Sequence, residues 1–506
     1  MDYPFWDISV GYGLLMAIVA VVHVFVSHFA IGGGLYLVVA ESFARRNSDT
    51  LKLDFLKKLS KFFVLVTLVF GALTGVAIWF IIGLLNPAAT EALIHHFVWA
   101  WASEWCFFLI EILAAIIYLY GWDKMTPRNH LVVGWIYFGA AWMSLFIING
   151  ILSFMLTPGD WLTTGSFFDG FFNDTFWSSL VLRTGVCVML AGLYSTLVIS
   201  RYPKSDFKAS TVRYNAAWGL IGMAIILPSL WWYWQGIPEA LTTVAVEAMP
   251  TPLDAWSFAW RFGMALIIAF LLFGLAMRRH VSLGVAIVMM ALGLAWFGSF
   301  EWFRESIRKP FVIYDYMYGN GLALAMADNY REDGLLPYIV FRTGDDGADL
   351  LRHACRRCHT IDGYHPLKPA FDGTHEIFIA GIIKGAHALK GNMPPFLGTE
   401  NEADMIAGHL YNRIDHRPIK AIYGLEGAEL GHKVYDIRCG KCHEFYGYND
   451  KSESLLGLDP EEINDILDMA EDFAGEMPPF TGDDAERQAL IEYLQFMTEQ
   501  AGSKAP

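Results

Sequence analysis

Charge is scarce in this sequence of 506 residues, in which charged residues make up 17% and hydrophobic residues 55%. Such a composition is typical of membrane proteins. Positive charge is scarcer still, and the formal net charge of −15 at pH 7 excludes nucleic acid as a ligand. Residues 341–506 hold 16 Lys and Arg against 29 Asp and Glu, whereas the apolar residues are concentrated before residue 300. The sequence therefore predicts a membrane part followed by an acidic, water-soluble part.

Cysteine is also scarce, and four of the six cysteines belong to the motif C-x-x-C-H. The motif occurs twice, as Cys355, Cys358 and His359 and again as Cys439, Cys442 and His443. It is the attachment motif of c-type haem, in which the two thiols bond to the porphyrin and the His becomes the proximal ligand of the iron. The other two cysteines, Cys106 and Cys187, lie in apolar segments and are expected to be buried packing residues.

Each motif is followed 34 residues later by a methionine in the sequence Met-Pro-Pro-Phe. These are Met393 after His359 and Met477 after His443. A thioether opposite a proximal His is the Met/His ligation of electron-transfer cytochromes. A zinc site is disfavoured because each motif has its own His and its own distant Met. The sequence therefore predicts two covalently bound haems c, held by two small helical domains at 346–418 and 419–506 after a linker at 314–345.

Eight segments within residues 1–313 are long and apolar enough to span a bilayer. They are 11–40, 62–85, 97–120, 131–155, 176–200, 216–234, 256–277 and 281–303. Every second loop between them is free of Lys and Arg, beginning with 86–96, and the positive-inside rule therefore places the N-terminus outside. Eight crossings return the haem c motifs to the same side. We expect a multi-pass protein of a bacterial inner membrane, with the haem c domains in the periplasm and the first helix as an uncleaved anchor.

Ionisable residues inside the membrane segments are few, and each is a candidate functional residue. They are His23, His28, Glu104, Glu111, Arg183, Arg261, Glu301, Arg304 and Glu305. Glu104 and Glu111 share a helix face, whereas His23 and His28 are five residues apart and point to different sides. One of these histidines is therefore a candidate ligand, while His28 is also explained by a hydrogen bond to a neighbouring helix. The two arginines before residue 300 either pair with carboxylates or hold haem propionates.

Histidine is too rare in the membrane segments for two familiar haem architectures. A cytochrome b of the bc type needs four ligand histidines, and a haem-copper oxidase needs six. The helix interiors offer only His23 and His28. Any haem in the membrane part would therefore use a carboxylate, a methionine or an open coordination position.

Several local patterns occur together and in order between residues 8 and 315. They are His23 in an apolar run ending at Glu41, Gly71–Gly75, Glu104 and Glu111 before Gly121-Trp122-Asp123, Asn149-Gly150, Pro158-Gly159, and Glu305-x-x-Arg308-x-Pro310. In these features the membrane part resembles subunit I of cytochrome bd-type oxidases. The expected fold is all-α, with an eight-helix transmembrane bundle followed by two small helical cytochrome c domains.

The resemblance implies roles for individual residues. His23 would be an axial ligand of the oxygen-reactive haem, and Glu305, or Glu301 in a shifted register, would ligate the neighbouring high-spin haem. Arg308 would help to bind the cofactor, and Glu104 and Glu111 would assist ligation or deliver protons. These sites imply one or two non-covalent haems of b or d type, at which O2 is reduced to water without copper.

The sequence also departs from that family. Arg183 stands where the family has the His ligand of its low-spin haem, and the Met partner falls near Gly263 or Met264. The sixth loop, which carries the quinol-binding region in the family, is short, and the haem c domains replace the ninth helix. We therefore expect an oxidase in which electrons enter through the haems c. The alternatives are a quinol-to-cytochrome c conduit and an electron-transfer subunit of a larger respiratory complex.

The expected partners follow from the apolar segments, the family resemblance and the acidic C-terminal domains. The apolar segments require membrane lipid, and enzymes of the bd type normally contain a second large membrane subunit. The acidic haem c domains would receive electrons from a periplasmic electron-transfer protein such as a cytochrome c.

Overall fold

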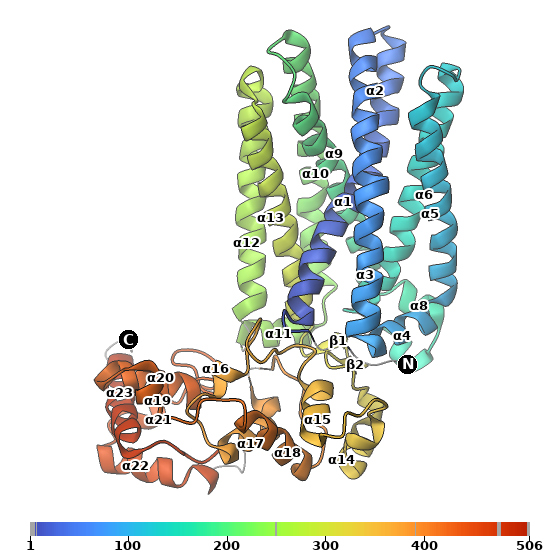
Figure 1. The fold of residues 1–506 in the computed structure, drawn as a ribbon. Coiled ribbons are helices and arrows are strands. Elements are labelled where there is room, and N and C mark those ends of the chain that lie inside the picture. Colours follow the sequence, from blue (N-terminus) through green and yellow to red (C-terminus); the bar gives the residue numbers. More distant parts are fainter. Residues whose placement is uncertain (1–5, 7, 248–249, 390, 473–476, 503–506) are drawn as a thin grey trace.

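The computed structural model describes residues 6, 8–247, 250–389, 391–472 and 477–502. These residues are mostly helical, and their single sheet is an antiparallel ribbon of β1 (Phe311–Ile313) and β2 (Met317–Tyr318). An upright bundle of long helices stands on a layer of short ones (Figure 1). The predicted all-α fold is confirmed.

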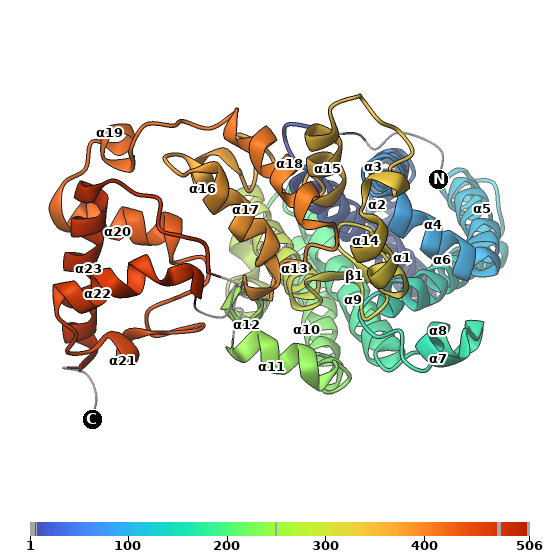
Figure 2. The same cartoon turned by 90° about the horizontal axis from the view of Figure 1, so that it is seen from below.

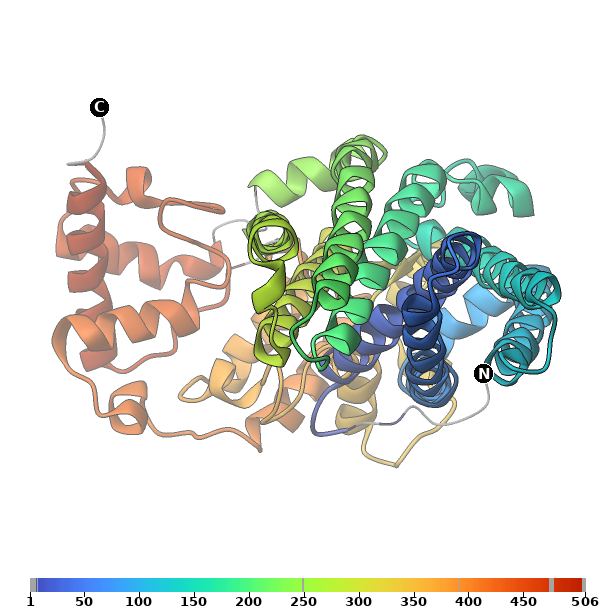
Figure 3. The ribbon, with the colours of Figure 1, turned by 90° about the horizontal axis from the view of Figure 1, so that it is seen from above.

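The described residues contain eight helical spans that are long and apolar enough to cross a membrane, as predicted. They are built from α1 (Tyr12–Arg46), α2 (Thr50–Val64) with α3 (Ala72–Leu85), α5 (Val98–Gly121), α6 (Pro127–Phe154), α9 (Phe176–Ile199), α10 (Asp206–Gln235), α12 (Pro250–Ala269) and α13 (Leu283–Ile307). Figure 3 looks down the bundle and shows α9 and α10 between the α12–α13 pair and the other helices. The central position of α9 agrees with the burial of most of its side chains.

The two ends of the bundle differ in what they carry. The near end faces the C-terminal domains and also carries the start of α1 (Figure 1). Its connections form short helices where the sequence suggested only loops, namely α4 (Pro87–His96), α7 (Trp161–Thr164), α8 (Phe167–Phe171) and α11 (Glu239–Glu247). The loops rich in Lys and Arg lie at the opposite, far end. The two ends therefore show the charge asymmetry on which the predicted orientation rests.

One expectation about cysteine is wrong. Cys187 is buried in α9, as expected, but Cys106 is exposed on the outer surface of α5. An apolar membrane helix can expose such a residue because lipid, like the protein interior, is apolar.

Two of the spans contain a π-helical turn, which sequence patterns do not reveal. The turn η1 (Leu65–Gly71) joins α2 to α3, and η2 (Phe270–Ala276) ends the α12 span. Turns of this kind are frequent at functional sites. The first of them ends at Gly71, just before the part of α3 that contacts His23.

The C-terminal part forms two helical units with separate apolar cores. The first contains α14 (Ala327–Asp333), α15 (Asp346–Ala354), α16 (Lys368–Phe371), α17 (Glu376–Lys384) and α18 (Glu400–Tyr411). The second contains α19 (Ile419–Tyr423), α20 (Gly427–Arg438), α21 (Ser452–Leu455), α22 (Pro460–Asp468) and α23 (Asp484–Gly502). Seen from below, the first unit lies under the bundle and the second extends past its edge (Figure 2).

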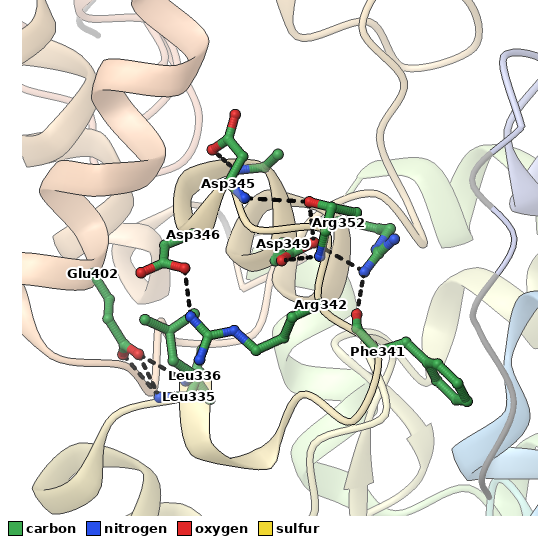
Figure 4. A network of polar contacts seen from close by, with 11 residues as sticks. Leu335, Leu336, Phe341, Arg342, Asp345, Asp346, Asp349, Arg352 and Glu402 are labelled. Atoms are coloured by element: carbon green, nitrogen blue, oxygen red, sulfur yellow. Dashed lines mark hydrogen bonds and ion pairs between the residues drawn. The ribbon is translucent and has the colours of Figure 1, made fainter.

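The first unit begins earlier than its predicted boundary at residue 346. Leu322, Tyr330, Leu335 and Ile339, all within the predicted linker, are buried in its core. The Glu402 carboxylate accepts hydrogen bonds from the backbone N–H groups of Leu335 and Leu336, both at 2.8 Å (Figure 4). Most of the expected linker is therefore part of the domain.

The same anchor recurs 84 residues later in the second unit. The Glu486 carboxylate accepts a hydrogen bond from the backbone N–H of Ile419 at 2.5 Å. Leu335 and Ile419 are thus equivalent positions, as are the buried Glu402 and Glu486. Because Ile419 follows directly on the first unit, the two domains are joined without a linker.

Candidate haem sites

The first C-x-x-C-H motif begins where α15 ends, and the polypeptide then turns to bring His359 opposite Met393. The imidazole Nε2 of His359 and the thioether sulfur of Met393 are 3.4 Å apart. The other ring nitrogen, Nδ1, donates to the carbonyl of His365 at 3.2 Å, which fixes the tautomer that leaves Nε2 free for a metal. Burial lowers the pKa of His359 and so favours the neutral imidazole, the form that ligates iron.

The second motif repeats this arrangement. His443 Nδ1 donates to the carbonyl of Asn449 at 3.0 Å. Asn449 and its equivalent His365 both adopt left-handed backbone conformations, with φ of 50° and 49°. Met477 lies in the wall of a cavity of about 590 Å³ that is also lined by α17 of the first domain. Both histidines are therefore held in the same way by a carbonyl six residues further on.

The first haem domain contacts the bundle through the residues of its motif. The Arg357 guanidinium donates to the Asn86 side-chain oxygen at 3.4 Å and to the backbone carbonyl of Asn320. Gly363 lies so close to Ser9 that a Cβ at this glycine would be 2.2 Å from the Ser9 carbonyl oxygen. Arg357 is the residue just before Cys358, so one haem-bonding thiol is held against the near end of the bundle.

The end of α13 lies beside this contact. Glu305 forms ion pairs with Lys309, at 3.1 Å, and with Arg308. Burial acts to lower the pKa of Lys309, but the Glu305 carboxylate and the Cys358 sulfur outweigh it and raise that pKa. The predicted ligand Glu305 and cofactor-binding residue Arg308 are therefore neighbours of the first haem c motif.

The second domain rests on the first through a buried arginine of α20. Arg438 forms an ion pair with Glu486 at 2.9 Å and donates to the Gly373 carbonyl of the first domain, also at 2.9 Å. A Cβ at Gly381 on α17 would lie 2.8 Å from Pro478, next to Met477. Cys442, a haem-bonding thiol of the second motif, packs against the core of the first domain. The two haem c sites therefore face each other across a close contact.

Within the bundle, His23 of α1 faces α3. Its Nδ1 is 3.0 Å from the Thr74 hydroxyl oxygen, and that hydroxyl donates to backbone carbonyls of its own helix. The hydroxyl oxygen therefore accepts a hydrogen bond from the His23 Nδ1–H group, which leaves Nε2 available for a metal. Gly75 makes room for the ring, because a Cβ there would lie 3.1 Å from the His23 Cε1 atom. This arrangement fits His23 as a metal ligand.

The sequence left open whether Arg183 and Arg261 pair with carboxylates or hold haem propionates, and the structure shows Arg183 in an ion pair. Arg183, which is 2% exposed, pairs with Glu301 at 3.3 Å, and Arg304 pairs with the same carboxylate at 3.1 Å. Arg261 lies apart from them, exposed on α12 with its guanidinium over the Phe258 ring. Glu301 is thus engaged with two cations, whereas Glu305 lies closer to the haem c motif.

Glu104 and Glu111 both reach from α5 to α6. The Glu104 carboxylate accepts a hydrogen bond from Ser144 at 2.8 Å, and that of Glu111 accepts one from Tyr137 at 3.0 Å. They share a helix face, as predicted. No hydrogen bond or ion pair within the described residues joins either of them to His23 or Glu305.

Sequence reasoning missed a buried charged cluster at the far end. The Glu41 carboxylate, which is fully buried, accepts hydrogen bonds from His130, Tyr118 and Arg45 at 2.6–2.8 Å. Its one local signal was the spacing of four residues between Glu41 and Arg45. His130 comes from a segment that was placed just outside a predicted span, and its proximity to Glu41 depends on the tertiary fold.

Comparisons with known proteins agree with this geometry. Residues 14–232 match the family described as cytochrome bd terminal oxidase subunit I. Residues 426–494 match the family described as cytochrome C oxidase, cbb3-type, subunit III. The membrane part of the chain thus matches cytochrome bd oxidase subunit I, and the end of the chain matches a cytochrome c domain. A search of the curated proteins finds no match.

The bd oxidase fold is also seen in a solved structure, that of bd oxidase from Geobacillus thermodenitrificans. The two chains are 14% identical, the similarity covers 60% of this chain and 88% of that one, and the TM-score is 0.50. This likeness concerns the fold. The bd oxidase match implies oxidoreductase activity and haems of b or d type, and the cytochrome c match implies covalent haem c. With the eight candidate spans, these matches indicate a multi-pass membrane protein of respiratory electron transfer.

Proposed function

We propose that the protein is a bd-like terminal oxidase subunit that takes electrons through two haems c and reduces O2 to water at one or two intramembrane haems. The haems supply the redox chemistry, and the protein holds and orients them. In this proposal His359 with Met393 and His443 with Met477 are ligand pairs, and each haem c is bonded to the two cysteines of its motif. His23 ligates a haem in the bundle.

The observation that carries the proposal is the contact between the first haem c motif and the near end of the bundle. Arg357 and Gly363 hold this motif against Asn86 and Ser9 at the near end of the bundle, the end at which Glu305 also lies. The second domain touches the first and, as Figure 2 shows, extends beyond the bundle. Electrons would therefore enter at the second domain, pass to the first and reach the bundle close to Glu305.

The remaining predicted residues have supporting roles in this proposal. Glu305 would become a ligand by exchanging its ion pairs with Lys309 and Arg308 for the metal. Glu104 and Glu111, held by hydroxyl groups of α6, would carry protons or assist ligation. Partly buried carboxylates among apolar helices suit this task because such residues are otherwise costly in a membrane.

O2 uptake by the purified full-length protein tests the proposal. With ascorbate and a mediator, or with reduced cytochrome c, the wild type should consume O2 and the His23→Ala variant should not. His95→Ala is the matched control, because the His95 side chain is 73% exposed at the near end and should leave uptake unchanged. Reduction of the haems c by quinol without O2 uptake would instead favour a quinol-to-cytochrome c conduit.

Orientation and partners belong to the same proposal. The near end would face the periplasm of a bacterial inner membrane, since the basic loops lie at the far end. A second membrane subunit would cover part of the bundle, and a periplasmic cytochrome c or similar protein would deliver electrons. Protease or a membrane-impermeant label added to intact spheroplasts should reach the haem c domains. Protection of these domains would contradict the orientation.

A further inference from the structure

A cavity of about 590 Å³ lies between the two C-terminal domains. The second domain lines it with Met477, Pro478 and Pro479, and the first domain lines it with residues of α17 and with His387 and Asp404. Pockets that hold small organic ligands and cofactors commonly have volumes of about 300–1,000 Å³. Because Met477 is the predicted iron ligand of the second haem c, a cavity of this size at its side chain fits a porphyrin.

One continuous face of α17 lines this cavity. Its residues are related by spacings of three and four positions, as is typical of one side of a helix, and they are Ile377, Ala380, Gly381 and Lys384. The opposite face of α17 is buried in the apolar core of the first domain. Figure 2 shows α17 on the side of the first domain that faces the second. The helix therefore separates the core of the first domain from the Met477 side of the second.

Ile377 is an apolar side chain on this face of α17, and 56% of its surface is exposed. Single exposed apolar residues are common on protein surfaces, but Ile377 lies in the wall of a cavity beside a predicted iron ligand. A porphyrin has apolar faces, and the removal of apolar surface from water is favourable. A porphyrin in this cavity would therefore cover Ile377 and be stabilised by the contact.

The second C-x-x-C-H motif also faces the first domain. Cys442 packs against the core of that domain, and the Lys441 ammonium lies 5.8 Å from the centre of the Phe371 ring. A haem that is bonded to Cys442 and ligated by Met477 extends between two residues that both face the first domain. The edge of the second haem would therefore lie at the boundary between the two domains.

Lys384 brings a positive charge to the same cavity. Its ammonium forms an ion pair with the Asp404 carboxylate at 2.9 Å, and both side chains are partly exposed in the cavity wall. Haem carries two propionates, and a bond between an ammonium and a carboxylate is a strong, charge-assisted one. Lys384 can therefore exchange Asp404 for a haem propionate without a change in the kind of bond that it makes.

We propose that the second haem c binds between the two domains, with α17 of the first domain forming one wall of its site. In this arrangement Ile377 and Ala380 contact the porphyrin, and Lys384 pairs with a propionate. The inference rests on the proposed function only for the haem c at the second motif, and it does not depend on O2 as the substrate. The first domain would thus help to set the potential of the second haem.

Redox titration of the purified full-length protein tests the proposal, and Met477→Ala identifies the potential that belongs to the second haem. Ile377→Asp would place a carboxylate against the porphyrin, where a negative charge stabilises the ferric state. We expect a lower midpoint potential for the second haem and an unchanged one for the first. Val340→Asp is the matched control, because Val340 is a branched apolar residue of the first domain that is 68% exposed and lies outside the cavity wall. Both of its potentials should match the wild type.

Lys384→Glu tests the same site at a position that is already charged. It replaces a positive charge beside the propionates with a negative one, so the potential of the second haem should again fall. Lys420→Glu is its control, because Lys420 also forms an exposed ion pair, with Glu426 at 3.1 Å, but lies outside the cavity wall. The pyridine haemochrome spectrum should show wild-type haem c content in all four charge variants, which serves as the measure of correct folding.

An unchanged potential of the second haem in both Ile377→Asp and Lys384→Glu would overturn the proposal and identify the cavity as a solvent-filled gap. A shift confined to the first haem would also overturn it, because α17 would then belong to the first site alone. These outcomes are independent of oxidase activity. A protein that consumes no O2 but shows the expected shifts would support the shared haem site and refute the oxidase, and O2 uptake without the shifts would do the reverse.

Discussion

The protein itself orients the histidines of the candidate haem sites through a hydrogen bond at one ring nitrogen. In each, Nδ1 is occupied by an oxygen: a hydroxyl for His23, and backbone carbonyls for His359 and His443. A ring held in this way has one tautomer and one direction in which Nε2 points. Each candidate ligand histidine therefore depends on the oxygen that fixes its tautomer and its orientation.

At this scale, Met393→Ala should change the first haem without removing it. Its two cysteine bonds and His359 remain, but the thioether that raises the potential is lost. We expect a lower midpoint potential for one of the two haems c and loss of its share of the weak red absorption band of thioether-ligated ferric haem. Spectroelectrochemical titration measures both effects.

Met469→Ala is the control for this substitution, because Met469 lies in the second domain and is 46% exposed. Its titration should match that of the wild type. A Met393→Ala protein with two unchanged potentials would show that another side chain supplies the sixth ligand.

Among the structural elements, the haem domains depend on one buried carboxylate each. Glu402 accepts hydrogen bonds from Leu335, Leu336 and Thr399 backbone N–H groups, and Figure 4 shows how it joins α18 to the segment before α15. Glu486 ties α23 to Ile419 in the same way and also pairs with Arg438. These contacts connect the first and last parts of each domain.

Glu402→Ala should therefore destabilise the first domain. Several backbone donors would lose their acceptor in a buried position, at a cost of about 3 kcal/mol. Denaturant titration followed through the Met393-dependent absorption band measures the loss. Glu400→Ala, an exposed position on the same helix, should leave the midpoint nearly unchanged. Equal midpoints for the two variants would contradict the anchoring role of Glu402.

Glu41 plays a comparable part in the bundle, where it joins α1 to α5 and α6. Glu41→Ala would leave the His130 ring nitrogen, the Arg45 guanidinium and the Tyr118 hydroxyl without their acceptor. Breaking a buried charged network of this kind costs about 3–5 kcal/mol. We expect a clear fall in the thermal unfolding temperature in detergent.

The matched control for Glu41→Ala is Asp123→Ala. Asp123 pairs with Lys57 at the same end of the bundle, but its side chain is 77% exposed. Its removal should have little effect, because exposed ion pairs contribute little to stability. A similar fall in both variants would mean that the far end responds to any loss of charge.

For the whole molecule, the contact between the two C-terminal domains would set the order of electron transfer in the proposed oxidase. Gly381→Val would place side-chain atoms where Pro478 now packs and would push the second Met-Pro-Pro loop away from α17. Stopped-flow reduction should then show slower transfer between the two haems c, since electron tunnelling weakens with distance. The first domain should still reduce the bundle haem at the wild-type rate.

Glu400→Ala provides the control, because Glu400 is exposed on α18 of the first domain. Unchanged transfer in Gly381→Val would contradict a direct route from the second domain to the first.

The sequence was most informative where chemistry fixes the spacing of residues. The C-x-x-C-H motifs, the methionines 34 residues later and the eight apolar spans are local patterns, and the structure places His359 opposite Met393 accordingly. The buried contacts of Glu41 with His130 and of Glu402 with Leu335 join residues 89 and 67 positions apart. No local pattern reveals them. The extent of the first domain was misjudged for this reason, since residues 322–339 are buried only by tertiary packing.

The absence of a linker between the haem domains has one more consequence. Because Ile419 begins the second repeat directly after the first, the period of 84 residues is the spacing from one anchor to the next. Each period adds its own anchor, its own thiols and its own ligand pair. The C-terminal part therefore extends beyond the bundle in steps of one domain. A chain that gained or lost one period would gain or lose one haem c site, and successive domains would still be in contact.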